Sequence, residues 1–221
     1  MMKKLFFILT TFIFFCSKSF AADCSAVNIN PTIKVTSSYG KLSYDTSKNI
    51  EEITTMAKNF NLVESGLFAS GLSTVNVNFD ITINTLGQLI GDSEYCVIPT
   101  EVTIFIGLDS PTIYVSNNIS ENSCEHHVIL RHEKTHQQIN KTTLEYYLPF
   151  FKDAALKIIK DIKPIKISDI KEIEQSTASL TKLYNSKMTK LVDFIKREMI
   201  IEQKKLDNPE NYHFESTLCK K

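Results

Sequence analysis

The sequence lacks several features that would suggest a common class of protein. It has no surplus of positive charge, because 25 basic residues are balanced by 25 acidic ones, and removal of the N-terminal signal described below leaves 22 against 25. This mildly acidic balance gives no electrostatic footprint for nucleic acid, so we expect no nucleic-acid partner. After residue 21, no apolar run is long enough to cross a bilayer. Internal repeats and low-complexity tracts are also missing.

The first 21 residues have the pattern of a secretory signal. Lys3 and Lys4 precede an apolar run from Leu5 to Phe15, and Ser19-Phe20-Ala21 gives a small-x-small exit. The run is too short to remain as a stable anchor in a bilayer. We therefore predict a secreted or periplasmic protein of the bacterial envelope with no stable membrane anchor after signal removal.

Cysteine is scarce, and the mature chain keeps four: Cys24, Cys96, Cys124 and Cys219. An even number in an exported chain predicts two disulfides, for which three pairings are possible. We favour Cys24 with Cys96 and Cys124 with Cys219. A zinc site of thiolates is the alternative, but no spacing is CxxC and an oxidising compartment disfavours it.

Residues 22–118 have the two-residue periodicity of β-strands. The clearest run is Val75–Asn84, where apolar and polar residues alternate, and Cys96–Gly107 is apolar on both faces, as in a more central strand. Shorter segments complete a mostly antiparallel sheet with one small helix: strands at Thr32–Val35 and Leu42–Tyr44, paired around Tyr39–Lys41, a strand at Thr112–Val115, and a helix at Asn49–Phe60.

From Asn122 onward the period changes to about 3.6 residues, which predicts helices. Pro149 is expected to break or kink the first helix, since proline removes a backbone donor and clashes with the preceding turn. A second segment then runs to about Ile162, and a last helix runs from about Ser168 to Leu206. The predicted fold is a single α+β domain over 22–221, with a sheet-rich half (22–118) and a helical half (119–221).

The most informative motif is His132-Glu133-Lys134-Thr135-His136 in the first of these helices. One turn separates the two histidines on the same helical face, so both imidazoles can bind one metal ion. Glu133 lies beside that face, where a carboxylate can act as general base toward a water molecule. The alternative is a surface helix that carries these residues by chance. The motif favours a zinc hydrolase.

The segment resembles the zinc-binding helix of zincin-type metallopeptidases, which share the signature HExxH. The resemblance implies a catalytic Zn²⁺ held by His132 and His136, a general base at Glu133, and a third ligand further along the chain. The stretch Leu206–Tyr212 also resembles small secreted bacterial zinc proteases.

The last helix contains two candidates for the third ligand. On a helical wheel, Leu180, Tyr184 and Ile195 define a buried stripe, and Glu198 and Glu202 fall on the same line. Two carboxylates on an apolar face need a positive partner, and zinc is one such partner. We therefore predict Glu202 as a zinc ligand and Glu198 as a residue that orients a histidine. The alternative is that both acids are solvated.

Two further residues follow the last helix. His213 is an alternative ligand, because a Cys124–Cys219 bridge would carry it back to the zinc helix. Tyr212 is predicted to be catalytic by donating a hydrogen bond to an oxyanion, although a buried structural tyrosine is the more common case.

We predict hydrolysis of a peptide or protein substrate, with Ile113–Val115 as a strand that pairs with the extended chain. A cell-wall amidase or esterase would use the same zinc chemistry on another substrate. The main alternative is a non-enzymatic exported envelope or binding protein with a structural zinc or none, which the charged Lys134 inside the motif also allows.

Overall fold

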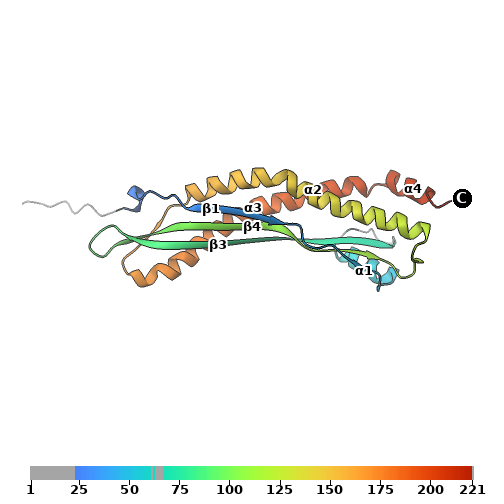
Figure 1. Ribbon diagram of the computed structural model, residues 1–221, viewed down its shortest axis with the longest axis horizontal. Helices are drawn as coiled ribbons and strands as arrows, with labels where there is room; N and C mark the ends of the chain where they lie inside the picture. Colours follow the sequence, from blue (N-terminus) through green and yellow to red (C-terminus); the bar gives the residue numbers. More distant parts are fainter. Residues whose placement is uncertain (1–22, 61, 63–66, 221) are drawn as a thin grey trace, which may run out of the picture.

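The structure is a computed structural model that describes residues 23–60, 62 and 67–220, so the predicted signal lies outside the described residues. The elements in chain order are η1 (Cys24–Ala26), β1 (Thr32–Ser38), β2 (Ser43–Asp45), α1 (Ile50–Asn59), β3 (Gly71–Leu89), β4 (Tyr95–Val115), α2 (Cys124–Asp161), β5 (Ile165–Ile167), η2 (Ile170–Glu172), α3 (Ile173–Leu206) and α4 (Pro209–Thr217). The molecule is elongated: α2 runs above a long narrow sheet in Figure 1, and α3 begins below the strands at the left and crosses behind them.

The sheet is mixed and is organised around β4. Strand β3 pairs antiparallel with β4 along almost its whole length, whereas β1 and β2 pair parallel with it, one after the other, and β5 pairs antiparallel with its first residues. The predicted antiparallel sheet and the predicted hairpin of β1 with β2 are therefore wrong. Alternation of apolar residues identifies the buried face of a strand, but it does not specify the direction of its partner.

Strand β4 is a single strand of 21 residues that continues through Pro111, where we predicted a separate strand. A β-bulge accommodates this proline, because Thr74 pairs with Thr112 but Asn76 pairs with Asp109, which leaves an extra residue on β4. Ser110 has a positive φ of 50° at this point. The bulge keeps one continuous strand beneath the helices.

Helices α2 and α3 pack antiparallel to each other on one face of the sheet, and the short α1 covers the other face near one end (Figure 1). The core lies between the sheet and the two long helices and includes Ile104, Ile106, Leu144, Ile159, Leu180 and Tyr184. Helix α2 extends over 38 residues with Pro149 inside it, so the predicted break is wrong. Pro149 is exposed, and apolar packing on both sides of it holds the helix together.

Both predicted disulfides are present. Cys24–Cys96 joins η1 to β4, and Cys124–Cys219 joins the first residue of α2 to the chain just after α4. Two disulfides are typical of a protein in an oxidising compartment. Within the described ranges, no helix is both long and apolar enough to cross a membrane.

Candidate metal centre

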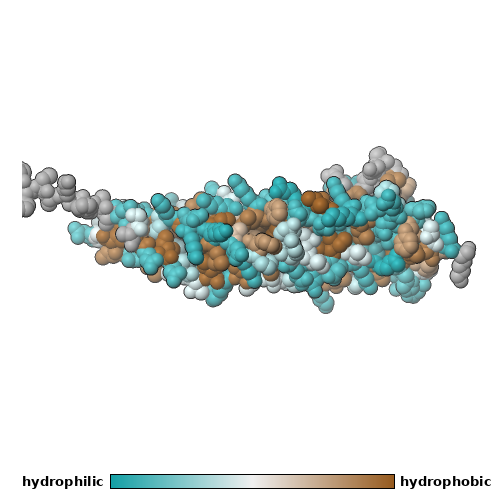
Figure 2. Space-filling model, turned by 90° about the horizontal axis from the view of Figure 1, so that it is seen from above, coloured by the Kyte–Doolittle hydropathy of each residue, from teal (hydrophilic) through white to brown (hydrophobic). Residues whose placement is uncertain are grey.

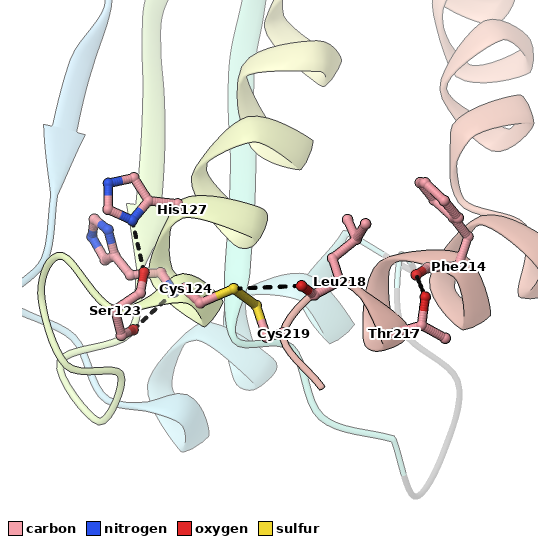
Figure 3. The surroundings of a disulfide bond; sticks show 8 residues. Ser123, Cys124, His127, Phe214, Thr217, Leu218 and Cys219 are labelled. Atoms are coloured by element: carbon pink, nitrogen blue, oxygen red, sulfur yellow. Dashed lines mark hydrogen bonds between the residues drawn. A yellow bond between two sulfur atoms is a disulfide. The ribbon is translucent and has the colours of Figure 1, made fainter. Parts of the chain in front are cut away.

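The N-terminal third of α2 carries the HExxH residues toward the end of the chain. Ser123 caps the helix by accepting a hydrogen bond from the His126 backbone N–H (3.1 Å). The neighbouring Cys124–Cys219 disulfide then ties α4 to this same end of α2 (Figure 3). The segment that follows α3 is therefore held against the face that presents His132 and His136.

Three ligand atoms converge at this point. Nε2 of His132 and Nε2 of His136 lie 3.0 Å apart, and Oδ1 of Asp207 lies 3.1 Å from the first and 3.0 Å from the second. A tetrahedral zinc ion with bonds of about 2.0–2.1 Å separates its ligand atoms by about 3.3 Å. The three atoms are thus spaced as one small cation requires, and the three residues form a group that could hold a metal ion.

The far nitrogen of each ring faces an acceptor. Nδ1 of His136 binds Oε1 of Gln203, whose Nε2 donates to the His136 carbonyl (3.0 Å) and to Asn140 Oδ1 (2.8 Å). Because an amide oxygen only accepts, Nδ1 of His136 carries the proton and Nε2 presents a lone pair. Nδ1 of His132 lies 3.0 Å from Oε2 of Glu215, in a contact too misaligned for a full hydrogen bond. The carboxylate still favours the same tautomer.

The charges around these atoms attract a cation. Burial disfavours the charged form of Asp207, but the contacts of its carboxylate with the two histidine side chains outweigh this and hold the pKa of the carboxyl far below the usual range. Burial also opposes protonation of His132 and His136, yet contact with Asp207 raises the pKa of both rings. Two nitrogen lone pairs and one carboxylate oxygen make a donor set that suits zinc.

Glu133 is buried beside this group, with 7% of its surface exposed. Burial raises the pKa of Glu133 to about 7, although the two neighbouring histidines act in the opposite direction. Gly71 makes room for it, since a Cβ at Gly71 would lie 2.7 Å from Glu133 Oε1 and 2.5 Å from Ile129 Cγ2. Gln137 fixes the helix to the same strand by donating to Ser73 Oγ (2.7 Å). The carboxylate is therefore held in place by α2 and β3 together.

Tyr212 lies at the same site, as the sequence led us to expect. Its ring stacks on His132 with centroids 5.4 Å apart, and its hydroxyl donates to Asp207 Oδ1 (2.8 Å). Burial and the Asp207 carboxylate both raise the pKa of the Tyr212 phenol well above its ordinary value, so the hydroxyl keeps its proton. Its catalytic role stays a prediction.

Asp207 takes the place that we predicted for Glu202. The Glu202 carboxylate binds Lys205 instead (2.6 Å), and Glu198 accepts a hydrogen bond from the Tyr147 hydroxyl (3.0 Å) rather than orienting a histidine. His213 is exposed on α4 and lies outside the group of possible ligands. The side of α3 that faces α2 continues through Met199 to Gln203. These residues directly follow Glu198 and Glu202, so the two glutamates lie one position off that side.

Sequence reasoning missed Asp207 because it lies at the C-cap of α3, outside the helix whose face we followed. One signal pointed to it: Asp207 immediately precedes Asn208-Pro209, where α4 begins and the chain turns toward Tyr212. The predicted substrate strand is also corrected, because Ile113 pairs with β2 on one side and β3 on the other, so Ile113–Val115 is not a free edge.

Comparison with known proteins adds no relative: no family model, no curated protein and no solved structure matches this chain.

Proposed function

We propose that this protein is an exported zinc-dependent hydrolase that cleaves peptide bonds. The observation that carries the proposal is the convergence of His132 Nε2, His136 Nε2 and Asp207 Oδ1 to within 3.1 Å of one another, with buried Glu133 alongside. The same three atoms without Glu133 would support metal binding alone. The carboxylate next to them is what supports hydrolysis.

The number of ligands favours a catalytic site over a structural one. Among the described residues, three side chains form the metal-binding group, whereas a structural zinc site has four protein ligands. The Asp207 side chain is 28% exposed and the Tyr212 residue 51%, so solvent and substrate can approach from this side. A fourth position is then left for water or substrate.

The residues of the chain have separate roles in the proposed reaction. When bound, zinc acts as a Lewis acid toward the scissile carbonyl and the attacking water. Glu133, with its pKa raised to about 7, takes a proton from that water and passes it to the leaving amine. Tyr212 keeps its proton, and its hydroxyl, which lies on Asp207 beside the ligand atoms, would donate a hydrogen bond to the developing oxyanion. Replacing Tyr212 with Phe should lower kcat more than it raises KM.

Strand β3 supports a peptide as the substrate. Among the described residues β3 pairs only with β4, so its second edge is open to an extended chain. Gly71 at the start of β3 lies against Glu133, so this edge begins beside the general base. A peptide paired here would cross the site with its backbone held along the strand.

Metal analysis and one conservative substitution test the proposal. Protein purified without added zinc should contain about one zinc per chain. Glu133→Gln should keep the metal and lose hydrolysis of a broad peptide library by about 100-fold or more. Glu125→Gln, a matched change in the first turn of the same helix, should affect neither. Metal retained without any activity in the unaltered protein would favour a binding protein instead.

A further inference from the structure

A cluster of exposed aromatic rings lies on the long helices, away from the metal centre. Tyr146 (64% exposed) and Phe150 (60%) lie on α2 with their ring centroids 5.9 Å apart, and Phe194 (39%) lies on α3. Tyr147 joins them, with its ring 5.2 Å from Phe194 and 6.3 Å from Phe150, and its hydroxyl is fixed by Glu198. The rings therefore form one contiguous apolar surface, and exposed surfaces of this kind are typical of interaction sites.

The apolar surface continues along α3. At 100° per residue, Leu183 and Ile201 lie within about 20° of Phe194 on the helix, and they are 43% and 48% exposed. From Leu183 to Ile201 the stripe runs about 27 Å along the helix axis. Figure 2, which views the molecule from above Figure 1, shows hydrophobic residues interspersed with hydrophilic ones along the length of the visible face.

Positive charges follow the same stripe. Lys187, Lys190 and Arg197 lie within about 60° of Phe194 on the helix, and within the described ranges none of the three makes an ion pair. Helix α3 as a whole carries seven basic and four acidic residues, although the mature chain is mildly acidic. We call this surface of α3, with the adjoining aromatic rings of α2, the basic–aromatic flank.

We propose that the basic–aromatic flank is a docking surface for an anionic lipid bilayer. Exposed aromatic and aliphatic side chains that alternate with lysine and arginine on one side of a helix are typical of segments that lie in the membrane interface. The excess positive charge complements acidic headgroups. A straight stripe along two antiparallel helices also fits a plane better than it fits a pocket. Attachment through side chains on the outer surface of folded helices would be peripheral and reversible.

Vesicle co-sedimentation of the mature protein tests this inference with two matched variants. The protein should bind vesicles of phosphatidylcholine and phosphatidylglycerol in equal parts, and should bind phosphatidylcholine alone far more weakly. The triple substitution Lys187→Gln, Lys190→Gln and Arg197→Gln should lower the partition coefficient about 100-fold. The control Lys152→Gln, Lys182→Gln and Lys196→Gln removes the same charge from exposed positions at least 120° away from Phe150 on α2 or from Phe194 on α3, and it should lower the coefficient only a few-fold.

A second pair of variants tests the apolar contribution. Ile201→Ser on the flank should weaken vesicle binding about five- to ten-fold, whereas Ile200→Ser, equally exposed but turned away by 100°, should not. Absence of binding to anionic vesicles, equal loss in both triple variants, or self-association through the flank without vesicle binding would each overturn the proposal. Glu133→Gln protein should bind vesicles normally, so this test is independent of the proposed hydrolysis.

Discussion

Removal of the Cys124–Cys219 disulfide should weaken the metal centre as well as the fold. The bridge ties the end of α4 to the start of α2. The segment between α3 and Cys219 contains three residues of the site: Asp207, Tyr212 and Glu215. Only α4 and its short flanking turns connect Asp207 to the bridge. Without the bridge, this C-terminal segment is held mainly by the contacts of Asp207 and Glu215 with the two histidines and by the stacking of Tyr212 on His132.

The structure allows the two effects to be separated. The Cys124–Cys219 bridge joins residues 95 apart and, by reducing the entropy of the unfolded chain, raises the free energy of the unfolded state by about 4.7 kcal/mol. The Cys24–Cys96 bridge, with a separation of 72, raises it by about 4.4 kcal/mol. Replacing either pair with serine should therefore lower the free energy of unfolding by a similar amount. Only the Cys124→Ser/Cys219→Ser protein should also lose zinc affinity, by about 10- to 100-fold, because residues that support the ligands are released.

Urea unfolding of the metal-free proteins measures the first effect, and competition with a chromophoric chelator measures the second. Limited proteolysis of the folded proteins shows whether α4 has been released. If α4 becomes accessible to protease while zinc affinity is unchanged, then Tyr212 and Glu215 do not support the ligands. An equal loss of affinity in the Cys24→Ser/Cys96→Ser protein would show that affinity follows global stability instead.

Three further predictions concern the site itself. Asp207→Asn should lower the zinc affinity by at least about 10-fold, whereas Glu202→Gln should leave it unchanged; isothermal titration with zinc compares them directly. Gly71→Ala should displace the Glu133 carboxylate and lower kcat/KM about 100-fold while zinc stays bound, and Gly87→Ala, which creates a similar close contact at Ile173, should not. Contact with Asp207 raises the pKa of both histidines, so protons compete with zinc for the ligand nitrogens. Zinc affinity should therefore fall as the pH decreases through that raised pKa. An affinity that does not change between pH 8 and about pH 5 would contradict this.

The part of the site that sequence could identify is the part that lies on one helix. The relative positions of three residues depend only on the helical repeat of α2, and in the structure all three are buried: His132, Glu133 and His136. The identity of the third candidate ligand, at the end of α3, depended instead on how α2 and α3 are aligned along each other. Because α2 continues through Pro149, Gln203 comes level with His136 and Asn140, and the residue that reaches His132 is Asp207 rather than Glu198 or Glu202.

The sheet shows the same division between local and long-range information. Alternation located β3, and a more evenly apolar run located the centre of β4, because both patterns record which side chains are buried. They could not show that β1 and β2 run parallel to β4, nor that a bulge lets β4 pass through Pro111, since both depend on pairing between distant segments. The disulfide pairing was one of three possibilities and is confirmed.

Anomalous diffraction at the zinc absorption edge, from crystals grown with stoichiometric zinc, would locate the metal ion itself. We expect one strong peak within about 2.0–2.2 Å of His132 Nε2, His136 Nε2 and Asp207 Oδ1, with a fourth position open to solvent. A peak bound by Glu202 or His213, or no peak near the two imidazoles, would contradict this expectation.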